Sequence, residues 1–354
     1  MNDKKLDLNS IIGFILIFGI LVWIIYNNQP TQKEIDAEQA KKEQVIQQEK
    51  AEANKNAEIS NVATTIDSTS SDTLQIAKLK STLGNFAYSA TLPSAKNEVT
   101  TLENDVLLLK IANKGGYIVE ATLKNFTKFS KDSGQLVSLI KDNNANLNIQ
   151  LQTSDNRTLN TKDLYFEPTL TKAGENQILS MRLKAGPNEF LEYKYVLKPN
   201  DYMLDFDVQS QGLNKVLNTS KPLDLEWKLK SYRNEKSVSY ENRYTVADYK
   251  YEDDKFSYVS DGTAKEDTPV DVSYVSFKQH FFTSILLTEK PFKKSVIHSD
   301  NLVKDEEKDT IFTKQFKANV PLAFNNGEVD YKMNWYFGPS DYKLLKSYDK
   351  DIEK

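Results

Sequence analysis

Few side chains in this sequence could carry out acid–base or metal chemistry. Its only histidines are His280 and His298, and it contains no cysteine. Disulfides, cysteine-ligated metals, iron–sulfur clusters, thiol catalysis and any site that needs three histidines are therefore excluded. The two histidines lie eighteen residues apart in strands predicted to be neighbours. A paired general acid and base is one interpretation, and two separate packed or surface histidines, which we favour, is the other.

Other motifs with a known mechanism are missing from the sequence. It has no phosphate-binding glycine loop, no G-x-S-x-G and no H-E-x-x-H. Gly115-Gly116 fits a tight turn, and the acidic run Glu252-Asp253-Asp254 lacks the spacing of a calcium loop and fits an exposed hairpin tip. We therefore predict no catalytic residue, no cofactor-binding residue, no metal ligand and no cofactor.

A tyrosine-rich segment, residues 232–258, is the one candidate binding region. Arg233 and Arg243 are interleaved with its six tyrosines, which are Tyr232, Tyr240, Tyr244, Tyr249, Tyr251 and Tyr258. Tyrosine and arginine are favoured at recognition surfaces, but tyrosine is also an ordinary strand residue. Both a binding groove and plain strands fit the pattern.

The charge balance excludes one class of partner. The 354 residues include 46 Lys or Arg and 50 Asp or Glu, which gives a formal net charge of −4. A dedicated nucleic-acid-binding protein usually has a strongly basic domain, so we predict no nucleic-acid partner.

The N-terminus contains a long apolar run, and we predict a membrane anchor in residues 1–30. From Leu8 to Tyr26 the side chains are almost all apolar. As a helix these residues are roughly 28 Å long, which just spans a hydrocarbon core of about 30 Å. A cleaved signal peptide is the alternative, but the small residues of a cleavage site do not follow the run. Lysines flank the run on both sides, so they do not decide its orientation.

Residues 31–85 are predicted to be a linker, charged at first and then rich in serine and threonine. Such a composition buries too little apolar surface to offset the entropy of ordering.

Residues 86–337 show a hydrophobic period of two. Leu223, Leu225, Trp227 and Leu229 alternate with charged residues, and 329–337 alternates in the same way. We predict roughly fifteen strands, no helix before residue 338, and an all-β fold of one large antiparallel β-sandwich. A phenylalanine-rich strand near His280 is expected to build the core; its residues are Phe277, Phe281, Phe282, Ile285 and Leu287. Residues 338–354 begin with Gly338-Pro339-Ser340 and predict the start of a helix.

Four segments in this order resemble the family of the bacterial membrane protein insertase YidC. They are the opening LNSIIGFILIFGILVWIIYNNQP, Gly115–Ile118 leading to Leu123–Phe126, Val275–Phe282, and Tyr336–Tyr342. Ser340 departs from the family, which often has a lysine after the Gly-Pro.

The resemblance implies a periplasmic supersandwich domain, an anchor whose N-terminus lies in the cytoplasm, and residence in the bacterial inner membrane. It also implies that nascent membrane proteins, the lipid bilayer, the Sec translocon and its accessory SecDF complex are partners. In that family the insertase activity lies in five later transmembrane helices. None of these is in this chain, so we expect the coding sequence to continue beyond Lys354. The chain then corresponds to the N-terminal part of an insertase, which breaks no covalent bond and is not an enzyme.

Two other functions remain open at this point. The first is a membrane-anchored carbohydrate-binding or mutarotase-like module, whose enzyme form would require His280, His298 and a carboxylate in one cleft. The second is a purely structural envelope protein.

Overall fold

The computed structural model describes residues 72–129, 134–259, 265–309 and 311–353. These residues form three β-sheets, and every pair of neighbouring strands is antiparallel. The predicted all-β, antiparallel sandwich is confirmed, with nineteen strands in the described ranges where about fifteen were expected.

The largest sheet has nine strands in the order β13-β12-β15-β16-β19-β10-β9-β8-β7. In that order their bounds are Lys255–Val259, Val246–Tyr251, Val270–Gln279, Phe282–Lys294, Asp330–Pro339, Met203–Gln211, Phe190–Leu197, Asn176–Lys184 and Glu167–Ala173. The second sheet has six strands in the order β14-β17-β18-β11-β5-β6. These are Glu266–Asp267, Val296–Asn301, Phe312–Leu322, Leu223–Tyr232, Ala145–Gln152 and Thr158–Asn160.

The two large sheets face each other across an aromatic core. Trp227 of β11 stacks on Phe277 of β15 with ring centroids 3.7 Å apart, and Trp335 of β19 meets Trp227 edge-on at 4.6 Å. Phe277 also stacks on Phe316 of β18. Rings from both sheets thus interdigitate, as in other sheet-on-sheet cores.

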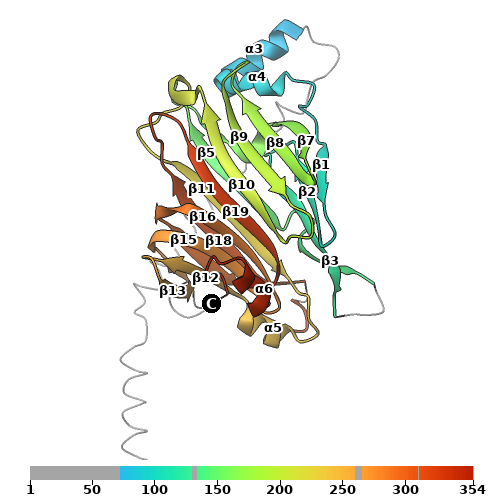
Figure 1. Cartoon of the computed structure of the whole chain (residues 1–354). Coiled ribbons are helices and arrows are strands. Elements are labelled where there is room, and N and C mark those ends of the chain that lie inside the picture. The colour runs from blue at the N-terminus through green and yellow to red at the C-terminus, as the bar shows by residue number, and fades with distance from the viewer. Residues whose placement is uncertain (1–71, 130–133, 260–264, 310, 354) are drawn as a thin grey trace, which may run out of the picture. The chain divides into compact units, whose positions relative to one another are not determined.

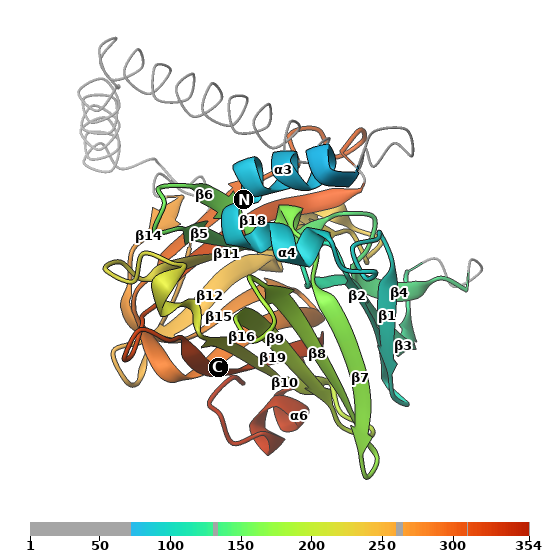
Figure 2. The same cartoon turned by 90° about the horizontal axis from the view of Figure 1, so that it is seen from above.

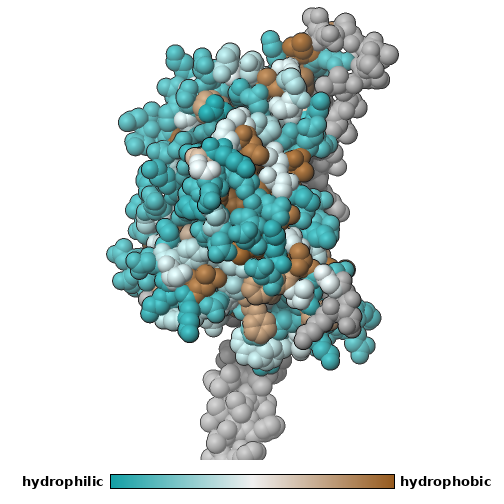
Figure 3. Space-filling view, turned by 45° about the vertical axis from the view of Figure 1, so that its right-hand side comes forward, coloured by the Kyte–Doolittle hydropathy of each residue, from teal (hydrophilic) through white to brown (hydrophobic). Residues whose placement is uncertain are grey.

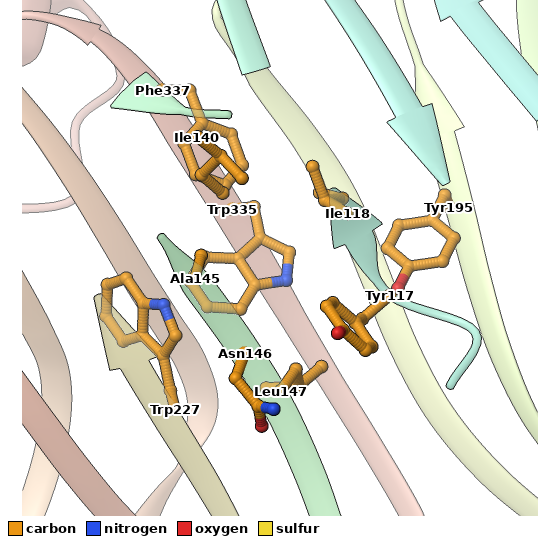
Figure 4. Close-up of a pocket in the computed structure, with 10 residues that line it drawn as sticks. All are labelled: Tyr117, Ile118, Ile140, Ala145, Asn146, Leu147, Tyr195, Trp227, Trp335 and Phe337. Carbon is orange, nitrogen blue, oxygen red and sulfur yellow. The ribbon is translucent and has the colours of Figure 1, made fainter. Parts of the chain in front are cut away.

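A third sheet of four strands, β1-β2-β3-β4, lies beside β7 and β8 in both views (Figures 1 and 2). Its strands are Val99–Glu103, Leu107–Ala112, Ile118–Thr127 and Leu136–Ile140. All three sheets contribute to one small cavity of about 20 Å³, where Trp335 lies between Trp227 on one side and Tyr117 and Tyr195 on the other (Figure 4). The core is therefore continuous from the sandwich to the third sheet.

The predicted alternation matches burial along most strands. Leu223, Leu225, Trp227 and Leu229 are at most 3 % exposed. Tyr336, which was expected on the solvent side of β19, is buried instead because Tyr202 and Tyr348 pack against it. Phe281 was expected in the core but is 57 % exposed, since it lies in the turn between β15 and β16. Both of these expectations were wrong.

Helices cap the two ends of the sheets, so the prediction of no helix before residue 338 was also wrong. α3 (Asp72–Leu83) and α4 (Ala87–Ala90) lie at one end, and α5 (Val238–Tyr244) and α6 (Tyr342–Ser347) lie at the other (Figure 1). α3 falls within the residues assigned to the linker, and its Leu79 and Leu83 are buried. The helix predicted after residue 338 is confirmed as α6. Asp341 caps its N-terminus, since its side chain accepts a hydrogen bond from the N–H of Leu344 at 2.8 Å.

The predicted anchor, residues 1–30, lies outside the described residues, as does most of the predicted linker. Within the described ranges, no helix combines the length and apolar character needed to cross a bilayer.

Candidate functional site

His280 occupies the two-residue turn between β15 and β16. Its Nδ1 is 2.6 Å from Oε1 of Glu235, and its ring stacks on Tyr244 and meets Tyr240 edge-on. The backbone φ of His280 is +25°, a value that residues other than glycine rarely adopt. The turn thus holds the imidazole against α5, which carries both tyrosines.

His298 lies in a different sheet and has different partners. It belongs to β17 of the six-stranded sheet, and its Nε2 is 2.8 Å from Oδ2 of Asp300. His280 instead follows β15 of the nine-stranded sheet. The structure therefore gives the two histidines separate carboxylate partners and does not join them in one site.

The tyrosine-rich segment lines a hollow of about 470 Å³, which we call the tyrosine hollow. Its walls include Tyr244, Tyr249, Phe256, Tyr258 and Tyr274, and its polar groups are Arg243, Asp248, Lys278 and His280. Three tyrosines of the segment are not among its lining residues: Tyr232 packs on Phe312, Tyr240 packs on Tyr244, and Tyr251 packs beside Tyr249. The segment combines a concave surface with ordinary strand positions.

Asp248 is the most perturbed acid of the tyrosine hollow. Burial raises its pKa to about 7, although the charge of Lys278 and a hydrogen bond with Ser276 pull it in the other direction. Asp248 faces the outer side of the nine-stranded sheet, opposite Ser276 in the register of β12 and β15. A carboxyl group that is partly neutral near pH 7 can both donate and accept a hydrogen bond there.

A second and larger hollow of about 800 Å³ lies on the other side of the β15–β16 turn, and we call it the phenylalanine hollow. Its apolar lining is Phe126, Phe129, Tyr202, Phe281, Phe282 and Leu344. Phe126 meets Phe282 edge-on at 5.3 Å, and the guanidinium of Arg233 lies 4.9 Å from the centroid of Phe129. Its polar rim includes Asn234, Glu235, Lys236 and Asp341.

Segments far apart in sequence build this hollow. β3 supplies Phe126, the β15–β16 turn supplies Phe281, and the end of β19 supplies Pro339. These positions come from three of the four segments that carry the resemblance. Sequence reasoning did not find the hollow, because nothing in one strand's pattern tells which strand ends meet in space.

Exposed aromatic side chains gather around the two hollows. We call Phe129, Tyr240, Tyr244, Phe281 and Tyr342 the aromatic surface; each is more than 40 % exposed. Tyr240 and Tyr244 come from α5, Tyr342 comes from α6, and Phe129 lies two residues after the end of β3. Phe129 and Phe281 line the phenylalanine hollow, Tyr244 lines the tyrosine hollow, and Tyr240 packs on Tyr244.

The acidic run Glu252-Asp253-Asp254 forms the exposed tip of the β12–β13 hairpin, as predicted. In the part of the chain that the structure describes, no three His, Cys, Asp or Glu residues are grouped as a metal site would require. The site is therefore described best as a pair of aromatic hollows with a mixed polar rim.

Comparison with known proteins places this architecture in a family. The model of the YidC periplasmic domain family matches residues 99–354, which include every strand of the three sheets. The chain belongs to the YidC periplasmic domain family. The match covers both hollows and α6, and it confirms the resemblance that the four segments suggested.

The curated relatives share similarity beyond that domain. The chain is 30 % identical over 353 residues to the membrane protein insertase YidC of Parabacteroides distasonis, covering 98 % of this chain and 54 % of that protein. It is 27 % identical over 351 residues to the protein of the same name from Porphyromonas gingivalis W83, covering 98 % and 54 %. The chain spans about half the length of the curated relatives it matches.

Two solved structures illustrate a distant likeness in fold. A putative aldose 1-epimerase from Escherichia coli aligns with a TM-score of 0.40 at 10 % identity, over 68 % of this chain and 98 % of that chain. An active YidC insertase structure with its first transmembrane domain resolved aligns with a TM-score of 0.36 at 11 % identity, over 73 % and 43 %.

Proposed function

We propose that this chain is the N-terminal part of a membrane protein insertase and chaperone that assists the insertion and folding of integral membrane proteins. The observation that carries the proposal is the similarity to proteins named membrane protein insertase YidC over 98 % of the chain, including the apolar N-terminus. In this proposal residues 8–26 anchor the chain in the bacterial inner membrane, and the β domain lies in the periplasm, between residues 86 and 337.

The site suits this role because insertion requires no bond to be broken. An insertase lowers the cost of moving polar segments into hydrocarbon, and the aromatic hollows offer apolar walls with a polar rim for such segments. We therefore propose that the chain contains no catalytic, cofactor-binding or metal-ligating residue. We also propose nascent membrane proteins, the Sec translocon and SecDF as its partners.

The mutarotase-like alternative is not proposed. It required His280 and His298 to meet in one cleft, whereas they lie in different sheets with Glu235 and Asp300 as separate partners.

Depletion of the natural gene product that contains these residues tests the proposed function. The assay follows a radiolabelled single-spanning membrane protein and measures how much of it becomes accessible to protease from the periplasmic side. Insertion should fall on depletion and recover on re-expression, whereas export of a secreted protein with no transmembrane segment should fall less. Unchanged insertion of several single- and multi-spanning reporters in fully depleted cells would contradict the proposal.

A further inference from the structure

The exposed aromatic residues of the described chain are confined to one end of the β domain. Tyr258, at the rim of the tyrosine hollow, is the only exposed large aromatic of the described residues outside the aromatic surface. The other exposed large apolar side chains in these ranges are aliphatic: Leu74, Ile76, Val99, Leu136, Leu170, Val270 and Ile311. The space-filling view shows a mostly hydrophilic face with small hydrophobic groups, one of them at the lower end where α5 and α6 lie (Figures 1 and 3).

The residue types at this end match those of a membrane–water interface. Phe281 is 57 % exposed, Phe129 is 47 % exposed and Tyr342 is 56 % exposed. Tyrosine is favoured at the headgroup level of a bilayer, and phenylalanine is among the residues that interfacial segments bury there.

Cations accompany these rings. Arg233 lies over Phe129, and Lys346 lies 5.5 Å from the ring centroid of Tyr342. Lys236 and Arg243 are exposed at the ends of the same loop and helix. Positive side chains beside aromatic rings favour a surface of anionic lipid headgroups.

Three carboxylates beside the aromatic surface have partners within the fold. Glu241 is buried and accepts hydrogen bonds from the backbone N–H groups of Asn234 and Glu235. Glu235 pairs with His280, and Asp341 caps α6. These three acidic groups are thus engaged within the fold, and after α6 Asp351 pairs with Lys250 while Asp349 is exposed. Lys236 and Arg243 are also exposed.

The course of the chain permits this end to face a bilayer. The described chain ends close to α6, at the same end as the aromatic surface, whereas α3 begins at the opposite end (Figure 1). The 45 residues from 27 to 71 connect the apolar run to α3. At about 3.3 Å per residue, they can reach at most about 150 Å.

We propose that the aromatic surface rests on the headgroup region of an anionic lipid bilayer. Phe129, Phe281 and Tyr342 then insert at the interface, and Lys236 and Arg243 contact lipid phosphates. The proposal rests on the membrane anchoring in the proposed function, and it adds a direct lipid contact of the β domain.

Fluorescence quenching in vesicles tests the contact directly. Because the chain has no cysteine, Phe281→Cys introduces a single labelling site for an environment-sensitive fluorophore. The full chain is reconstituted in vesicles of phosphatidylcholine and phosphatidylglycerol that contain a nitroxide-labelled lipid. Leu74→Cys is the matched control, because Leu74 is an exposed apolar residue in α3, at the opposite end.

The label at 281 should be quenched several-fold more strongly than the label at 74. Stronger quenching at 74 than at 281 would overturn the proposal, because the α3 end would then face the lipid. A label at 281 that is blue-shifted but not quenched would also overturn it, because protein would then cover the surface. Absence of quenching at both positions would also overturn the proposal.

The charge component has its own control. Lys236→Glu with Arg243→Glu should reduce quenching at 281, as should vesicles of phosphatidylcholine alone. Lys172→Glu with Lys221→Glu makes the same charge change at two exposed lysines elsewhere and should leave it intact. An equal reduction by both pairs would overturn the lipid-phosphate contact. Flotation of each variant with the vesicles reports anchoring separately. Loss of flotation would contradict the anchoring in the proposed function, whereas flotation without quenching at 281 would contradict only this inference.

Discussion

At the scale of single residues, the Gly115-Gly116 turn shows how closely the third sheet meets the sandwich. Gly116 has a φ of +68°, and a Cβ placed on it would lie 2.8 Å from the ring of Phe166. Its carbonyl oxygen accepts a hydrogen bond from the hydroxyl of buried Tyr195 at 2.9 Å. The sequence predicted the turn, but only the structure explains why glycine is required there.

Gly116→Ala is expected to lower the free energy of unfolding by about 2–4 kcal/mol, because it adds both backbone strain and a clash with a buried ring. Gly174→Ala is the matched control. Gly174 has a φ of +61° but has no atom within 4 Å of the position of a Cβ, so its cost should be only about 1 kcal/mol. Urea denaturation measures both; equal losses would contradict the packing argument.

Asp248 makes the stability of the domain depend on pH. Its pKa in the folded protein is raised from 3.8 to about 7, so the folded state holds more protons than the unfolded state between these values. The contribution of Asp248 to stability is therefore greatest below pH 4 and is lost as the pH rises to 7. Asp248→Asn should remove this pH-dependent contribution. The variant should therefore become more stable relative to the natural protein as the pH increases. Parallel curves of unfolding free energy against pH would refute this.

The histidines are expected to be dispensable for any chemistry. Replacing both His280 and His298 by glutamine should lower stability by about 1–2 kcal/mol at most. Each loses a contact with a carboxylate, and His280 also loses its packing on Tyr240 and Tyr244. Optical rotation of a freshly dissolved aldose should change at the same rate with the protein as with buffer. A faster change that disappears in the double variant would instead indicate an epimerase.

At the scale of elements, α5 is held in place by one buried carboxylate. Glu241 is 1 % exposed, and burial raises its pKa, while the N–H groups of Asn234 and Glu235 act against that shift. These N–H groups tie the loop after β11 to α5 and so position Tyr240 and Tyr244 beside His280.

Glu241→Ala should therefore cost about 2–3 kcal/mol, because it leaves buried donors without an acceptor. Glu103→Ala removes the same charged group from a half-exposed ion pair with Lys124 and should cost about 0–1 kcal/mol. Chemical denaturation compares the two variants. A loss for Glu241→Ala no larger than that for Glu103→Ala would contradict its structural role.

The elements differ in how far sequence could predict them. β11 was predicted well because one of its faces is buried and the other faces solvent, so apolar and polar residues alternate along it with a period of two. α3 was missed because only Leu79 and Leu83 are buried among its lysines, serines and threonines, which is too little for a visible apolar stripe. Tyr336 was predicted on the solvent-exposed face of its strand. Tyr348, twelve residues later, packs on it, and a tertiary contact of this kind leaves no mark on the alternation within the strand.

The same limit applies to the site. The tyrosine-rich segment was singled out because its composition is local, and it lines the tyrosine hollow. The phenylalanine hollow requires β3, the β15–β16 turn and the end of β19 to meet, and no periodicity encodes that meeting. Phe281 could have been suspected from its place next to His280 in a two-residue turn, where a large apolar side chain has little to pack against.

At the scale of the whole molecule, the described residues should fold without the N-terminal segment. A chain of this size buries about three quarters of the surface that its unfolded state exposes, which is enough for a stable core without metal or disulfide. Residues 72–354 should give a circular dichroism spectrum dominated by strand that a chelator does not change. A mainly helical spectrum, or unfolding by the chelator, would contradict this.

The central claim is that this family member handles membrane proteins during their insertion. Site-specific photo-crosslinking measures this most directly. A photoreactive residue is placed in the transmembrane segment of a ribosome-bound nascent chain, in membranes that contain the natural gene product carrying residues 1–354. The account predicts a crosslink between the nascent membrane protein and this gene product, and much less with a nascent secreted protein that lacks such a segment. Crosslinks to the Sec translocon alone, with none to this gene product from several membrane proteins, would contradict it.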